Sequence, residues 1–183
     1  MKWVLFTGAI ALFAISCQNQ GSTESSKGDS TVNSSADSKI EYAYLPPDHP
    51  ADYWERGNQK NLEFVLKSLK AFENNNIDEC ITAFADSVAV TIDGYDAKIT
   101  RDSLKTLFTR YRTDFPQMQI KMEDYESVIS KDKKNEWVSL WYKEINTNKS
   151  GMVDSIFKMF DLKIVDGKIA VLDEKIRHYP KKK

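Results

Sequence analysis

The second half of the chain alternates apolar and polar residues in long runs, and this pattern constrains the fold more than any other feature of the sequence. The runs begin near Met118 and end near Tyr179, and short polar segments at 131–135, 146–151 and 166–167 separate them. Alternation with a period of two is typical of half-buried strands, and short turns join antiparallel neighbours. The pattern slips near Met159 and Phe160, which predicts a β-bulge there. The second half therefore predicts four consecutive antiparallel strands.

The segment before these strands has the spacing of helices. Apolar residues recur every three or four positions over 59–73, and Asn58 can cap the start of that helix. A shorter helix is expected after Asn76, and a short hairpin over 88–99 turns at 93–94. A third helix is expected to begin after Thr100. Because the helices precede the long strands, the predicted class is α+β with a largely antiparallel sheet.

Several short motifs in this order resemble a known superfamily. They are LKAFEN at 69–74, FADSV at 84–88, IDG at 92–94, TRDSL at 100–104, WVSLW at 137–141 and VDGKI at 165–169. The stretch 58–178 resembles the nuclear transport factor 2-like superfamily, which includes polyketide-cyclase-like and ketosteroid-isomerase-like proteins. The resemblance implies a cone in which three helices pack in the concave side of a strongly curved, largely antiparallel sheet. It implies little about function, because enzymes, carriers and adaptors share this fold.

The N-terminus has the features of an export signal. Lys2 precedes an uncharged apolar stretch at 3–15, and the sequence Ala-Ile-Ser-Cys ends at Cys17. This ending resembles a bacterial lipobox, which implies cleavage before Cys17 and attachment of lipid to that cysteine. The alternative is an ordinary secretory signal with an incidental cysteine. The predicted organisation is a signal peptide at 1–16, a disordered Ser-rich tether at 17–39, a proline- and aromatic-rich lead-in at 40–57 and the folded domain at 58–180.

Lipid on Cys17 would make the membrane the first partner and the cell envelope the location. Gln18 is not the aspartate that retains some lipoproteins at the inner membrane, so the outer membrane is favoured. A formal net charge of -1 argues against nucleic acid as a partner. His49 and His178 lie far apart and lack neighbours at metal-ligand spacing, so no metal or cofactor is expected.

The resemblance leaves three functions open. The preferred one is non-catalytic binding of a small apolar ligand or a protein partner. The alternative is a proton-abstraction enzyme of the isomerase or cyclase type, with an aspartate base in the cone. The third is a homodimer formed through the outer face of the sheet. No residue matches a catalytic pattern, and the pocket candidates are Tyr142, Asp154, Asp173, Trp137 and Trp141, with Asp161 as a further carboxylate.

Each pocket candidate also has an ordinary structural interpretation. Asp154 and Asp173 are expected to be solvated or paired with lysines if they are not catalytic. Trp137 and Trp141 are expected in the core or at a sheet interface if they do not stack on a ligand. Alternation alone cannot tell which of these side chains faces the cavity, because a bulge reverses the facing of every residue beyond it.

Overall fold

The computed structural model describes residues 41–46 and 48–179. The predicted signal peptide, the lipid site at Cys17 and the tether lie outside the described residues, as does Pro180 at the end of the predicted domain. Those assignments, and the domain boundaries, therefore stay predictions. Within the described ranges, no helix is both long enough and apolar enough to cross a membrane.

The described part contains three helices and seven strands. In chain order they are β1 (Trp54–Arg56), α1 (Gln59–Glu73), α2 (Ile77–Ile81), β2 (Phe84–Ile92), β3 (Tyr95–Thr100), α3 (Arg101–Asp114), β4 (Gln117–Ser130), β5 (Glu136–Thr147), β6 (Val153–Val165) and β7 (Lys168–His178). The side chains of Asn58, Asn76 and Thr100 accept hydrogen bonds from the first turns of α1, α2 and α3. The three predicted N-caps are therefore confirmed.

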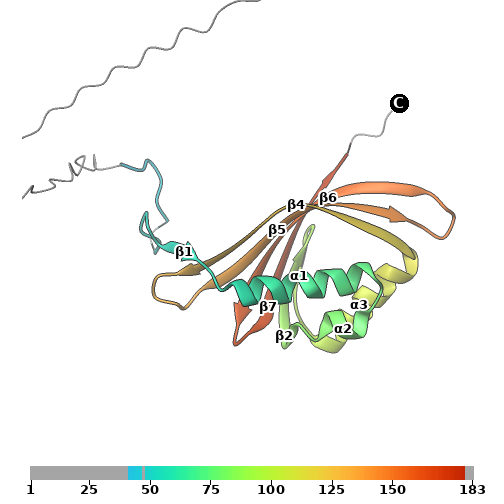
Figure 1. Cartoon of the computed structure of the whole chain (residues 1–183), viewed down its shortest axis with the longest axis horizontal. Coiled ribbons are helices and arrows are strands. Elements are labelled where there is room, and N and C mark those ends of the chain that lie inside the picture. The colour runs from blue at the N-terminus through green and yellow to red at the C-terminus, as the bar shows by residue number, and fades with distance from the viewer. Residues whose placement is uncertain (1–40, 47, 180–183) are drawn as a thin grey trace, which may run out of the picture. The chain divides into compact units, whose positions relative to one another are not determined.

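All seven strands belong to one sheet, in the order β1-β4-β5-β6-β7-β2-β3. Every neighbouring pair is antiparallel except β2 and β7, which run parallel. Figure 1 shows α1, α2 and α3 on one side of this curved sheet. The prediction of an α+β fold with three helices on a curled, largely antiparallel sheet is confirmed.

The hydrophobic core lies between the helices and the face of the sheet that they cover. Val65 of α1, Leu104 of α3 and Leu140 of β5 are almost inaccessible to solvent and belong to one cluster. Along β5 buried and half-buried residues alternate without interruption, so one face of the strand meets the helices. Trp137 and Trp141 are half-buried on the opposite, outer face of the sheet.

The bulge predicted at Met159 and Phe160 is wrong. Strand β6 pairs with β5 and β7 in unbroken register at these residues, and its register shift against β7 lies between Lys163 and Ile164. A second shift interrupts β4 beside β5, between Met122 and Asp124. The apolar alternation slips in β6 because the inward position before Met159 carries a buried lysine, and a charged residue there resembles a change of face.

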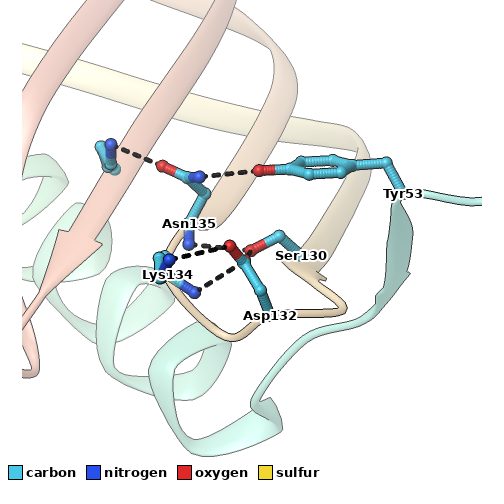
Figure 2. Close-up of polar contacts among 6 residues, drawn as sticks. Tyr53, Ser130, Asp132, Lys134 and Asn135 are labelled. Carbon is cyan, nitrogen blue, oxygen red and sulfur yellow. Dashed lines mark hydrogen bonds and ion pairs between the residues drawn. The ribbon is translucent and has the colours of Figure 1, made fainter. Parts of the chain in front are cut away.

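The lead-in is fastened to the turn between β4 and β5. Figure 2 shows Asn135 as the centre of this attachment: its side chain donates a 2.8 Å hydrogen bond to the Tyr53 hydroxyl, and its backbone N–H donates to Oγ of Ser130. Its side-chain oxygen accepts a 2.8 Å hydrogen bond from Nζ of Lys163. The backbone carbonyl of Tyr53 also accepts from Lys131, so the lead-in is held through both its backbone and its side chains.

Candidate ligand-binding cavity

A cavity of about 580 Å³ lies between the helices and the inner face of the sheet. Its wall is mainly apolar and aromatic, with Leu69, Phe72, Phe108, Leu140, Phe160 and Leu172 among the residues that line it. Cavities of this size and character are typical sites for small molecules. The cavity is therefore the strongest candidate for a functional site within the described part of the chain.

Three neighbouring strands each place a polar residue in this apolar wall. The inward positions of β5, β6 and β7 alternate with outward ones, and the cavity is lined by Asn146 of β5, Lys158 of β6 and Glu174 of β7. All three residues are buried. A buried polar group in such a wall is costly unless it has partners, so the contacts of these residues decide what the cavity can do.

Glu144 of β5 lies directly behind this wall, with no exposure to solvent. Its Oε1 accepts a 2.5 Å hydrogen bond from the Tyr111 hydroxyl and a 2.6 Å hydrogen bond from Nδ2 of Asn146. Its other oxygen lies 3.4 Å from Nζ of Lys158. Two donors and one cation therefore stabilise the negative charge of Glu144 without water.

Lys158 stands between two carboxylates. Its Nζ lies 2.8 Å from Oε1 of Glu174, in addition to its contact with Glu144, and sits over the ring of Tyr111. Burial alone would lower the pKa of Lys158, but the charges of Glu144 and Glu174 outweigh it and raise the pKa. The ammonium group therefore stays charged, and it is already paired with both carboxylates.

A second buried cation balances the charge of this cluster. The guanidinium of Arg112 in α3 donates to the backbone carbonyls of Phe115 and Glu73. Burial lowers the pKa of Arg112, while the nearby charge of Glu144 opposes that shift. Two glutamates and two cations thus leave the net charge of the buried cluster near zero.

Glu174 is the buried carboxylate that meets the cavity. Glu144 is sealed behind Tyr111 and Asn146, whereas Glu174 lines the cavity with 7% of its surface exposed. One of its oxygens faces Lys158. Among the residues that the structure describes, none donates a hydrogen bond to Glu174, whose buried Oε1 has only the ion pair with Lys158. A molecule in the cavity can therefore meet a carboxylate with unused acceptor capacity.

The cavity contains two of the five pocket candidates named from the sequence. Tyr142 lines it as a fully buried side chain, and burial raises its pKa well above the usual tyrosine value. Asp154 also lines it but is exposed. The other three, Asp173, Trp137 and Trp141, occupy outward positions of their strands.

On the outer face, the aspartates have a structural role. Nζ of Lys175 lies 2.8 Å from both Asp161 and Asp173, which is the lysine pairing that the sequence allowed for Asp173. Trp137 lies under the ammonium group of Lys163. Trp141 is half-buried on the same face, where the predicted homodimer would form, and that assembly stays a prediction.

Sequence reasoning missed Glu144, Lys158, Glu174 and Tyr111. A signal was present: counting by two from the apolar residues Leu140, Phe160 and Leu172 reaches a charged residue in each strand within four positions. Alternation alone does not say which face of a strand is inward, and on β7 Asp173 was chosen instead of its neighbour Glu174. Within residues 41–46 and 48–179, no group of three or more potential ligand side chains is arranged to hold a metal ion.

No protein-family model matches the chain, and no curated protein does either. Solved structures do match. An LEH-like epoxide hydrolase from M. tuberculosis superposes with a TM-score of 0.53 at 15% identity, over 65% of this chain and 84% of that one. A protein of unknown function from Burkholderia pseudomallei, described as nuclear transport factor 2-like, superposes with a TM-score of 0.52 at 16% identity, over 64% of this chain and 90% of the other.

A third match of the same description comes from an Exiguobacterium species. It superposes with a TM-score of 0.51 at 16% identity, and the match covers 64% of this chain and 98% of the other. At such identities the likeness concerns the fold and leaves function open. The helices on the concave side of a curled seven-stranded sheet and these structural matches together show that the chain has the fold of the nuclear transport factor 2-like superfamily.

Proposed function

We propose that this domain binds a small, mostly apolar molecule in the cavity, and that it does so while anchored to a membrane of the cell envelope. The observation that carries the binding proposal is the cavity of about 580 Å³ with an apolar wall and one buried polar cluster. An apolar wall supplies affinity through burial, and a few fixed polar groups supply orientation.

The anchor part of the proposal rests on Cys17 and its lipobox-like setting. The chain has two cysteines, so Cys80 provides a matched control. Intact-mass spectrometry of protein from native membranes is expected to show a chain that begins at Cys17 with added acyl chains. Cys17→Ser should abolish the added mass and Cys80→Ser should leave it. An unmodified chain that begins elsewhere would contradict the anchor and leave the binding proposal standing.

The binding proposal is tested by filling the cavity. Ile156 lines it from β6, and the next residue, Phe157, lies on the outer face of the same strand. Ile156→Trp should displace a bound molecule, whereas Phe157→Trp places the same new side chain outside the cavity. Protein purified from its native membrane is extracted with organic solvent, and the extract is compared by mass spectrometry. A compound present with wild type and Phe157→Trp but absent with Ile156→Trp is the expected result.

One result of the extraction would contradict binding in the cavity. An extract that contains the same compounds for all three proteins would show that they are bound elsewhere or carried by detergent. Folding of Ile156→Trp is checked by circular dichroism, so that loss of the compound reports on the cavity. A second substitution at the rim, Leu107→Trp, also blocks the cavity, because Leu107 lines it while remaining 41% exposed.

A second candidate function is favoured by one observation, the buried carboxylate of Glu174 in an apolar cavity. A carboxylate in such a place can act as a general base. The base of this candidate enzyme is a glutamate, because the aspartates named from the sequence lie at the rim or on the outer face. Incubation with cyclic ketones in deuterated water should then give deuterium incorporation that Glu174→Gln abolishes. No incorporation above the buffer rate would remove this candidate.

A further inference from the structure

At the polar cluster formed by Asn146, Lys158 and Glu174, the cavity wall offers acceptors to its occupant, while the donors of the cluster are already used. The side-chain NH2 group of Asn146 donates to the Tyr111 hydroxyl and to Glu144, and the Tyr111 hydroxyl donates to Glu144. Lys158 is held by Glu144 and Glu174. The donors of the polar cluster are therefore turned toward Glu144, behind the wall of the cavity.

The free acceptors of the cluster lie at the cavity. Glu174 lines the cavity and keeps one oxygen free of hydrogen bonds from the described residues, as shown above. The side-chain oxygen of Asn146 is buried and has no hydrogen-bond partner there either. An unpaired acceptor in an apolar wall is costly, and a donor on the ligand would relieve that cost.

The charges of the cluster also disfavour a ligand that carries a carboxylate. A ligand carboxylate would lie against Glu174, with Glu144 just behind it, and the one nearby ammonium group is already shared between these two glutamates. The repulsion acts in a low-dielectric site, where like charges cost far more than in water. A hydroxyl or an amine meets the same carboxylate favourably.

We infer that the ligand is a mostly apolar molecule whose polar head donates hydrogen bonds, a hydroxyl or an amine, and that Glu174 selects this head against a carboxylate. The inference rests on the proposed binding function and names its ligand class. Glu174 selects the polar head of the ligand, and Lys158 holds the carboxylate of Glu174 in position.

Three probes with one apolar cage and different heads test it: adamantan-1-ol, adamantan-1-amine and adamantane-1-carboxylate. Each is titrated calorimetrically into the full chain in detergent, with the detergent alone as the blank. The alcohol and the amine should bind at least about tenfold more tightly than the carboxylate, because a site built for a donor rejects a head that lacks one.

The variants Glu174→Gln and Asp173→Asn provide the matched comparison, since both remove a lysine-paired carboxylate from β7 and only Glu174 faces the cavity. Glu174→Gln should weaken the amine and bring the carboxylate within about threefold of the alcohol, because the new amide both donates and accepts. Asp173→Asn should leave the wild-type ranking unchanged. The wild-type ranking alone decides the question if Glu174→Gln does not fold.

The outcomes separate the two proposals. A carboxylate that binds most tightly to wild type, or a ranking that Glu174→Gln leaves unaltered, overturns the inference while binding in the cavity stands. Failure of all three probes to bind, or equal binding to Ile156→Trp, overturns the proposed binding and this inference with it.

Discussion

The hydroxyl of Tyr111 lies 2.5 Å from Oε1 of Glu144 and donates a hydrogen bond to it. This contact joins α3 to β5 beneath the cavity, across 33 positions of the sequence. Burial raises the pKa of Tyr111, so the hydroxyl keeps its proton and remains a donor. The positions of the helix and the sheet are therefore coupled through a carboxylate that water does not reach.

Tyr111→Phe should reduce the free energy of unfolding by about 1–3 kcal/mol, because Glu144 would lose one of its two donors while staying buried. Urea unfolding followed by circular dichroism measures the change. Tyr125→Phe is the control, since that ring is 49% exposed on β4, and its effect should stay within about 0.5 kcal/mol. Equal effects of the two substitutions would contradict a supporting role for the Tyr111 hydroxyl.

Lys158→Met should destabilise the protein by about 3–5 kcal/mol, because it leaves Glu144 and Glu174 buried without their shared cation. Lys175→Met offers a close comparison: Lys175 also bridges two carboxylates, Asp161 and Asp173, but on the exposed outer face. Its loss should cost at most about 1 kcal/mol. If the two methionine variants unfold at the same urea concentration, burial of the Lys158 cluster has no energetic consequence.

Stability should fall in alkali partly because of Cys80. Burial raises the pKa of its thiol from 9.0 to about 11. The folded state therefore retains a proton that the unfolded state loses, so this contribution is complete below pH 9.0 and disappears as the pH rises toward 11. Cys80→Ala should reduce the slope of unfolding free energy against pH in this window by up to about 1.4 kcal/mol per pH unit. An unaltered slope would contradict the shift.

Gly57→Ala should destabilise the junction between the lead-in and α1. A Cβ atom at Gly57 would lie 2.3 Å from Oγ of Ser127 and 2.9 Å from the backbone of Ser127 and Val128. Such overpacking costs about 1–3 kcal/mol. The double variant with Ser127→Ala should recover part of this loss, since it removes the nearest atom but not the backbone contacts. Additive effects of the two substitutions would show that the strand backbone moves aside.

Asn135→Ala should release the lead-in, because the Asn135 side chain joins Tyr53 to Lys163. Hydrogen–deuterium exchange should become faster at Tyr53 and in β1, while α3 stays protected. Asn148→Ala in the turn between β5 and β6 is a control, since Asn148 makes only local hydrogen bonds to Ser150 and Met152. Unchanged exchange at Tyr53 in Asn135→Ala would mean that the backbone pairing of β1 with β4 suffices.

Features that depend on neighbours in the sequence could be predicted. The caps at Asn58, Asn76 and Thr100 follow from side-chain oxygens placed before helical spacing, and the shared face of Trp137 and Trp141 follows from alternation within one strand. The fold class followed from the order of these local elements. Each of these features is fixed by contacts within a few residues.

Features that depend on distant partners could not be predicted. The parallel pairing of β2 with β7 joins segments about 80 residues apart, and no turn residue specifies it. The inward position of Lys158 is tolerated only because Glu144 and Glu174 arrive from two other strands. A strand read by itself favours an outward lysine, and alternation does not say which face is inward, so Asp173 was named and the inward Glu174 was missed.

The parallel pairing of β2 with β7 has a consequence for synthesis of the chain. The helices and the β2–β3 hairpin leave the ribosome early, but the strand beside β2 is the last of the seven to be made. The β2–β3 hairpin therefore lacks its parallel neighbour until β7 has been made. We expect the domain to close only after β7 has been made, so a nascent chain stalled before β7 should remain sensitive to protease along most of its length.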